Sequence, residues 1–246
     1  MITVVTLAER PDLVSQVFSV ADDWPAFMLQ DPIGGVFYGR LAAAFPEFQL
    51  MGLDDAGAPV AKLHSIPFRW DGSDAGLPDR GWEAVLQQGF NDRDAGREPN
   101  AVSFLEALIA PTLRGRGFST ALVKAGRDNA SRHGFVDVFA PVRPAHKARQ
   151  PRTSMASYAA RVRDDGLPSD PWLRVHVRLG ARIVKVCPLS MVIPGTLAQW
   201  RQWTGQPFDV PGDTEIDGAL VPVHVSVDND YAVYVEPNVW VHHNLA

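Results

Sequence analysis

Four residues in a row, Arg114, Gly115, Arg116 and Gly117, stand between an apolar run and the start of an expected helix. Glycine lets the backbone approach a ligand closely, and the free amides and the dipole at a helix N-terminus favour an anion. The stretch APTLRGRGFSTAL, residues 110–122, therefore predicts a backbone cradle for a phosphate or pyrophosphate. A solvated turn is the other interpretation of the two arginines.

Other motifs fit this stretch less well. The Walker pattern needs a lysine that is missing here, and the dinucleotide fingerprint needs a third glycine where Thr120 stands. GFSTA, residues 117–121, imitates the nucleophile elbow of hydrolases. That elbow needs its serine at the very end of a strand, whereas Ser119 lies nine residues beyond Ala110. A hydrolase is therefore not favoured.

Glu106 is the only ionisable side chain in the apolar run AVSFLEALIA, residues 101–110, which leads into this loop. An amine with a pKa near 10.4 is protonated at neutral pH and must lose a proton before it can attack an acyl group. Burial is expected to raise the pKa of a carboxyl group toward the working range of a general base, so Glu106 is the candidate base. A structural glutamate, paired with an arginine or turned to solvent at the strand edge, is the other interpretation.

The elements that must position these residues mix strands and helices along the whole chain, which predicts one central sheet and an α/β (α+β) class. Strands are expected over 2–7, 48–68 (a hairpin), 101–110, 135–142 and 181–193, and helices over 10–18, 35–44, 82–90, 119–133 and 170–180. Thr196 and Gln199 form a capping box for a further short helix. Two apolar runs around Asp228–Asp230 predict a strand pair near the end.

The loop resembles motif A of the GNAT superfamily of N-acetyltransferases, Arg/Gln-x-x-Gly-x-Gly/Ala. Arg114, Gly117 and Ser119 fall on its three defined positions, with Gly115 at a position that is commonly glycine, and Ser119 stands where the family has Gly or Ala. The order of elements over residues 2–193 is also similar to that of the family. The resemblance implies a GNAT-like mixed central sheet with flanking helices in 1–193, and a C-terminal helix and strand-pair extension, 194–246, that completes the same domain.

By this resemblance, the co-substrate is acetyl-CoA, and an acetyl or other short acyl group passes to an amine by direct attack. The thioester would sit where the fourth and fifth strands splay apart. The pantetheine arm would pair like a strand with Leu108, Ile109 and Ala110, and the pyrophosphate would lie on the amides of Arg114, Gly115, Arg116, Gly117, Phe118, Ser119 and Thr120. The alternative is a GNAT-like domain that binds acyl-CoA without catalysis, as a sensor or scaffold.

In the family, a tyrosine four residues before the glycine that closes the helix at 170–180 protonates the departing thiolate. Counting back from Gly180 reaches His176, so the sequence departs from the family pattern here. An imidazolium has a reference pKa near 6.5 and can donate a proton near neutrality, so His176 is the candidate acid. A histidine packed under the sheet and hydrogen-bonded is the other interpretation, in which case Tyr158 is the next candidate.

Composition limits the partners of the chain. Its 246 residues carry a net charge of −5, which argues against nucleic acid and mildly favours a cationic small-molecule amine as acceptor. No apolar run reaches the ~20 residues of a membrane span, and no signal-peptide pattern is present. The single cysteine, Cys187, excludes an internal disulfide. We expect a cytoplasmic enzyme without a metal site, consider a homodimer, and regard the insert 143–169 as a candidate lid over the acceptor.

Overall fold

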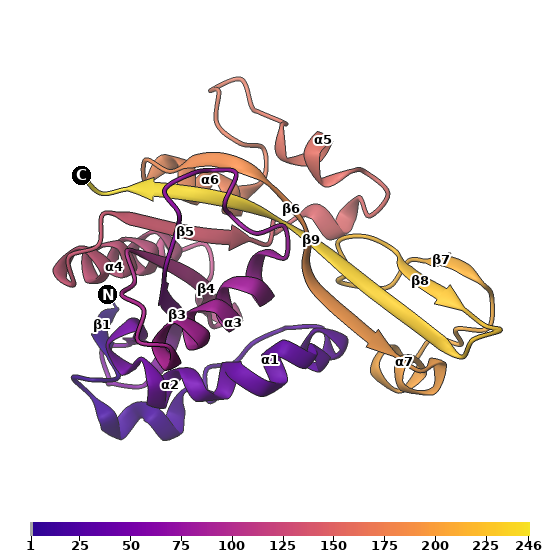
Figure 1. The fold of residues 1–246 in the computed structure, drawn as a ribbon, viewed down its shortest axis with the longest axis horizontal. Helices are drawn as coiled ribbons and strands as arrows, with labels where there is room; N and C mark the ends of the chain where they lie inside the picture. Colours follow the sequence, from indigo (N-terminus) through magenta and orange to yellow (C-terminus); the bar gives the residue numbers. More distant parts are fainter. Residues whose placement is uncertain (1) are drawn as a thin grey trace.

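The computed structural model describes residues 2–246, in which nine strands form one mixed sheet (Figure 1). The strands follow the order β1-β2-β3-β4-β5-β9-β8-β7, and β6 pairs with β9 outside this path. Only the pair β4 and β5 is parallel within this range. The strands are β1 (Thr3–Thr6), β2 (Gln49–Leu53), β3 (Pro59–Phe68), β4 (Ala101–Ile109), β5 (Asp137–Val142), β6 (Arg182–Gly195), β7 (Gly212–Thr214), β8 (Val223–Ser226) and β9 (Tyr231–Asn244).

The helices alternate with these strands, so the mixed α/β class expected from the sequence is confirmed. The α-helices are α1 (Pro32–Phe37), α2 (Leu41–Ala44), α3 (Gly81–Asp94), α4 (Phe118–Arg132), α5 (Met155–Ala159), α6 (Pro171–Arg178) and α7 (Leu197–Thr204). Short 3-10 helices are η1 (Pro11–Gln16), η2 (Ala26–Gln30), η3 (Tyr38–Arg40), η4 (Pro46–Phe48), η5 (Pro111–Leu113) and η6 (Lys147–Arg149).

Two expected helices differ from the prediction. The segment 10–18 forms only the 3-10 helix η1, whose N-cap Arg10 makes no side-chain cap hydrogen bond. The segment 35–44 is divided into α1, η3 and α2. Glycines at 34, 35 and 39 weaken a continuous helix there because each costs backbone entropy.

Helices cover both faces of the sheet, and two glycines allow the closest approaches. A Cβ atom at Gly126 of α4 would lie 2.9 Å from the Phe104 ring, and one at Gly89 of α3 would lie 2.4 Å from Ile66. Leu63, which also contacts the position of Gly126, and Ile66 point to opposite faces of β3, since side chains alternate along a strand. Helix α4, which follows the candidate phosphate loop, is thus fixed directly against β3 and β4.

The C-terminal strand reaches further into the fold than a terminal strand pair. Strand β9 forms the expected hairpin with β8, and its last part, Val239–Asn244, lies between β5 and β6. The capping box of Thr196 and Gln199 is present at the start of α7. Beyond the body, β6 and β9 continue as a long ribbon that carries α7, β7 and β8 as a protruding arm (Figure 1).

The arm has its own buried core, and the N-terminal segment docks onto it. Phe27 and Met28 of η2 are buried with Trp200 of α7 and Tyr234 of β9. The rings of Phe27 and Tyr234 meet edge to face, with centroids 5.2 Å apart. The irregular chain just before η2 is therefore held between the body and the arm.

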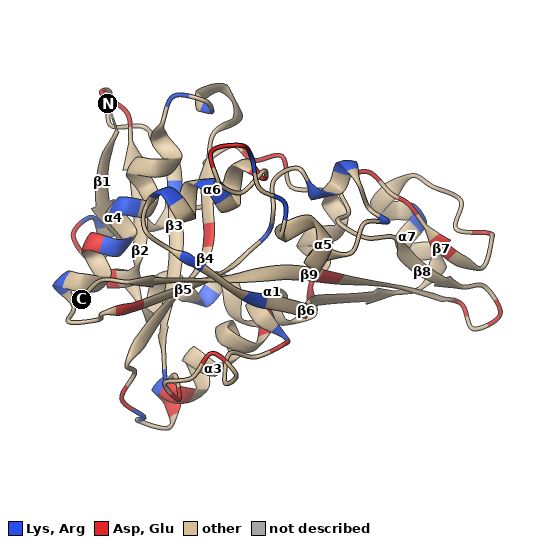
Figure 2. Ribbon diagram, turned by 90° about the horizontal axis from the view of Figure 1, so that it is seen from above, with Lys and Arg blue, Asp and Glu red and all other residues tan. Residues whose placement is uncertain are grey.

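Charged residues of both signs are spread over the body and the arm (Figure 2). Among residues 2–246, no helix is both long and apolar enough to cross a membrane.

Candidate active site

The candidate phosphate loop has the backbone that the sequence predicts. Strand β4 ends at Ile109, and η5 leads to Gly115 and Gly117, whose φ angles are +77° and +80°. Gly117 is the N-cap of α4, and no side chain caps this helix end. The first four amides of a helix have no partner within the helix, so those of residues 117–120 remain available to a ligand. Residues 114–117 are exposed.

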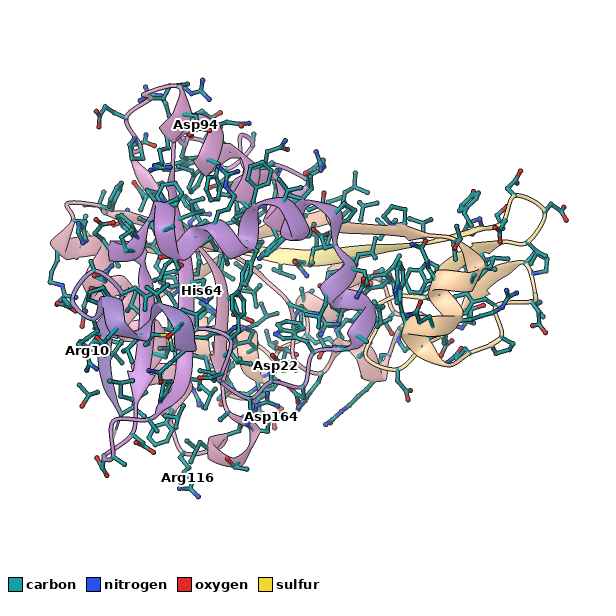
Figure 3. The ribbon with its side chains drawn as sticks, turned by 90° about the horizontal axis from the view of Figure 1, so that it is seen from below. Arg10, Asp22, His64, Asp94, Arg116 and Asp164 are labelled. Carbon is teal, nitrogen blue, oxygen red and sulfur yellow. The ribbon has the colours of Figure 1, made fainter. Side chains whose placement is uncertain are left out.

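The two arginines of the loop differ in their surroundings. Arg114 donates from both terminal nitrogens to the carboxylate of Asp23, at 2.7 and 2.6 Å, and from Nε to the carbonyl of Ile109 at 3.3 Å. The hydrogen bonds from Arg114 lower the pKa of the Asp23 carboxyl. Arg116 points away from the body into solvent (Figure 3).

Strands β4 and β5 separate just before the candidate base. They pair only at Val102 with Val138 and at Ser103 with Phe139. From Phe104 onward β4 pairs with β3 alone among the described strands, up to Ile109. At Leu108, Ile109 and Ala110, where the pantetheine arm was expected, no described strand pairs with β4 on its β5 side, and the Ile109 carbonyl accepts from Nε of Arg114.

Glu106 lies near this separation in a dense group of hydrogen-bond donors. Its Oε1 accepts from Nε1 of Trp24 at 3.0 Å, and its Oε2 accepts from the Tyr38 hydroxyl and forms an ion pair with Nζ of Lys62 at 3.1 Å. The side chains of Glu106 and Lys62 are 10% and 5% exposed. The carbonyl of the preceding residue, Leu105, accepts from Nε1 of Trp82 at 2.8 Å. The carboxylate is buried and fully partnered.

These partners overturn the expectation that burial raises the pKa of Glu106. Burial does oppose ionisation, but the charge of Lys62, the neighbouring His64 and the Tyr38 hydrogen bond together hold the pKa of the carboxyl below its ordinary value. A carboxylate with a lowered pKa stays ionised at neutral pH and is a weaker base. Neither an arginine partner nor a solvent-facing position applies, because the cation is a lysine on the next strand.

Sequence reasoning missed four residues of this group: Trp24, Tyr38, Lys62 and His64. The last two carried a signal, because they are polar residues two apart in the apolar strand β3 and must share a face. His64 is opposite Glu106 in the β3–β4 register, and Figure 3 shows it inside the body, between the N-terminal helices and the sheet. Trp24 and Tyr38 come from a distant segment and gave no signal.

A second buried ion pair stands behind Trp24. Arg143, just after β5, donates from Nε to both oxygens of Glu236 on β9, at 3.1 and 2.9 Å. Its guanidinium also lies over the Trp24 ring, 5.4 Å from the centroid. Tyr234 donates to Glu236 at 2.7 Å. The indole that contacts Glu106 is therefore held between the two ion pairs.

His176 lies in a different place from the Glu106 group. It is 2% exposed in α6, and its Nδ1 is 2.9 Å from Nε2 of His243 on β9. Burial, and then the neighbouring His243, lower the pKa of His176 to about 3. The imidazole is thus neutral near pH 7, and its role as an acid stays a prediction. Tyr158 donates to Asp170 at 2.8 Å.

A cavity of about 400 Å³ lies between the N-terminal segment and the arm. Asp23 and Phe27 line it from one side, and Trp203, Asp217 and Gly218 from the other. Asp23 is the partner of Arg114, and the next residue, Trp24, contacts Glu106. Through Asp23 and its neighbour in sequence, the cavity lies one residue away from contacts to the phosphate loop and to Glu106.

Comparisons with known proteins decide the family. No family model matches the chain. A curated relative, the arginine N-acetyltransferase avaD of Aspergillus versicolor, is 33% identical over 272 residues, which cover 98% of this chain and 93% of the relative. The chain belongs to the GNAT superfamily of N-acetyltransferases. The family that the sequence resemblance indicated is thereby confirmed.

Solved structures agree on the GNAT fold. The loading GNATL domain of CurA from Lyngbya majuscula has a TM-score of 0.60 at 15% identity, with 100% of this chain and 98% of that chain covered. The GNAT-like decarboxylase GphF, solved with isobutyryl-CoA, has a TM-score of 0.61 at 20% identity, with both chains covered completely. At these identities the likeness concerns the fold.

As a GNAT N-acetyltransferase, the chain is an enzyme that transfers an acyl group from acetyl-CoA to an amine. The catalytic interpretation is therefore favoured over the sensor or scaffold interpretation. The separation of β4 and β5 beside Glu106 and the uncapped start of α4 are the two features on which a site for this reaction can be built.

Proposed function

We propose that the acyl acceptor is arginine or a closely related cationic amino acid, acetylated on its α-amino nitrogen. The observation that carries the proposal is the 33% identity, over nearly the whole of both chains, with an arginine N-acetyltransferase. The net charge of −5 also favours a cationic acceptor, because the protein attracts it.

The α-amino nitrogen is the better nucleophile of such a substrate. A guanidinium has a pKa above 12 and is always protonated in practice, so its nitrogens have no free lone pair for attack. The pKa of an α-amine lies several units below that of a guanidinium, so the α-amine releases a proton far more readily to a nearby base. The guanidinium is then free to pair with carboxylates.

The cavity beside Trp24 fits that second role. Asp23 and Asp217 line it, and its volume of about 400 Å³ lies within the range of small-molecule sites. We place the guanidinium beside Asp217, because both oxygens of Asp23 already accept from Arg114, and the α-amine toward Glu106.

We also propose that acetyl-CoA lays its pyrophosphate on the amides of the Arg114–Thr120 loop and its pantetheine along Leu108–Ala110. The uncapped Gly117 and the open edge of β4 support this placement. The division at 193, the homodimer, the cytoplasmic location and the lid at 143–169 stay predictions.

The acceptor is tested by product analysis with acetyl-CoA and a panel of amines. Arginine should give a singly acetylated product, with tandem mass spectrometry placing the acetyl group on the α-nitrogen. Citrulline is the matched control, since it has nearly the shape of arginine without the charge, and its kcat/KM should be at least about tenfold lower, a difference of about 1.4 kcal/mol. Equal rates for both, or acetylation of the guanidine, would contradict the proposal.

A variant locates the charge contact. Asp217→Asn should raise KM for arginine severalfold and leave citrulline kinetics unchanged. An equal change for both substrates would show that the cavity does not bind the guanidinium.

A further inference from the structure

The imidazole of His64 is held in one tautomer by its neighbours. Its Nδ1 is 2.8 Å from Oε1 of Gln49 on β2. The amide nitrogen of Gln49 donates to the carbonyls of Phe45 and Ser65, both at 2.8 Å, so the amide cannot be turned around. The Gln49 oxygen therefore accepts, the hydrogen of His64 is on Nδ1, and Nε2 carries a lone pair.

The Nε2 lone pair has no hydrogen-bond partner among the described residues, and solvent does not supply one because the residue is only 2% exposed. Unpaired polar atoms at such depth are uncommon, because burial without a hydrogen bond costs about 1–3 kcal/mol. Oε2 of Glu106 is 4.0 Å away. Two acceptors face each other here without a hydrogen between them.

The surroundings of this gap suit a cationic donor. Glu106 faces it from β4, Lys62 from the same strand as His64, and the Tyr38 ring lies edge-on to the imidazole with centroids 5.3 Å apart. Burial lowers the pKa of His64 to about 4, with Lys62 acting in the same direction and Glu106 against it. A neutral imidazole and an ionised carboxylate together offer two acceptor atoms to an ammonium group.

We infer that Nε2 of His64 is the base that takes the proton from the acceptor amine, and that Glu106 positions the ammonium and stabilises the imidazolium. The ammonium gives one proton to Nε2, and the freed lone pair forms the N–C bond at the thioester carbonyl. The C–S bond then breaks, and the departing thiolate takes the second proton of the nitrogen. The imidazolium returns its proton to water after the product leaves.

The inference explains why Glu106 can be saturated with donors. Both groups have lowered pKa values, so the choice between them rests on geometry: three partners occupy Glu106, whereas Nε2 of His64 has a free lone pair. The fixed negative charge of Glu106 beside His64 is what an imidazolium requires. Trp24 is the only one of the three that lies on an irregular segment, outside η1 and η2, and we expect the amine to displace it. The inference rests on the proposed function only in that a protonated amine must reach this centre.

The test compares two variants at position 64 with whichever amine of the panel is turned over fastest. His64→Asn keeps a donor for Gln49 at the place of Nδ1 and has no atom at Nε2, whereas His64→Gln places an amide near Nε2 and loses the Gln49 contact. Both should lower kcat at pH 7 by about 100-fold with unchanged acetyl-CoA affinity. The deficit should shrink as pH rises, and added imidazole should restore part of the turnover of His64→Asn above the rate measured without acceptor.

Wild-type turnover in either variant would overturn the assignment, and so would a deficit that is the same at every pH and is not relieved by imidazole. Nitrogen NMR of the wild-type enzyme keeps the test independent of folding and of the acceptor. The spectra should show that Nδ1 of His64 is protonated and Nε2 is unprotonated from pH 6 to 9. A proton on Nε2 in this range would also overturn the assignment. Failure of arginine as a substrate affects only the proposed acceptor, because neither readout depends on arginine.

Discussion

The cofactor side and the acceptor side that we propose for this enzyme are built in opposite ways. The loop Arg114–Thr120 is one short, mostly exposed stretch that we propose binds acetyl-CoA through its backbone amides. The acceptor centre is buried and consists of side chains from segments far apart in the chain, namely Trp24, Tyr38, Lys62, His64 and Glu106. A site made of backbone amides tolerates a change of side chain but not a change of backbone conformation. A site made of side chains is instead sensitive to the substitution of each of them.

On the cofactor side, the largest effect is expected at Gly117 of the loop. Gly117→Val forces a β-branched residue to φ +80° in open space and should displace the amides, raising the Kd for acetyl-CoA at least about tenfold, or about 1.4 kcal/mol, in calorimetry. Gly134→Val is the matched control, since Gly134 has φ +83°, lies in open space and follows the other end of α4. Equal affinity losses in both variants would mean that strain, and not the loop, is responsible.

At the acceptor centre, Glu106→Gln removes the charge and keeps the shape. It should lower kcat by roughly tenfold or more at neutral pH, because Lys62 loses its partner and an imidazolium at His64 loses its stabilising charge. Tyr38→Phe, which removes one donor to the same carboxylate, should have a smaller effect. Steady-state kinetics with a saturating amine measures both, and full activity of Glu106→Gln would show that the cluster is only structural.

The loss of protein stability at low pH is expected to come from buried histidines. The pKa of His176 is lowered to about 3, and those of His64 and His243 to about 4, from 6.5 in the unfolded chain. Their contribution to stability is complete above pH 6.5 and is lost as pH falls toward 4, because the unfolded chain then binds more protons. Burial raises the pKa of Asp31 to about 7, so this carboxyl adds stability as pH falls. It is one group, however, and the three histidines outweigh it. Thermal unfolding from pH 7 to 4 should therefore show a falling Tm.

The variant His176→Asn tests both the origin of the acid sensitivity and the prediction that His176 is the catalytic acid. The asparagine amide keeps a polar group toward Nε2 of His243, so turnover should stay within about twofold of wild type, and the fall of Tm with pH should become shallower. A tenfold loss of turnover with unchanged acetyl-CoA affinity would instead establish His176 as the acid.

The difference between the two sides also decided what the sequence could predict. The loop is local, so its glycines and the helix that follows were readable from neighbouring residues. Glu106 was found because it interrupts an apolar strand, but its lowered pKa was not, since Lys62 faces it from another strand. The central place of β9 was missed because strand order depends on long-range pairing, and Trp24 joins the site through a segment without periodic structure.

The smallest effect is expected where the two sides touch. The pair of Asp23 and Arg114 is exposed, with side chains 62% and 45% accessible, and such pairs contribute about 1 kcal/mol or less. Asp23→Asn should shift Tm by little, and kcat by less than about twofold. A large loss of kcat in this variant would show that the two sides are mechanically coupled.

The separation of the two sides is tested most directly by titrating acetyl-CoA in parallel kinetics of wild type, Gly117→Val and Glu106→Gln. We predict that Gly117→Val raises the KM for acetyl-CoA and regains most of its kcat at saturation. Glu106→Gln should keep the wild-type KM for acetyl-CoA and lose kcat at every concentration. Loss of the same parameter in both variants would contradict the account.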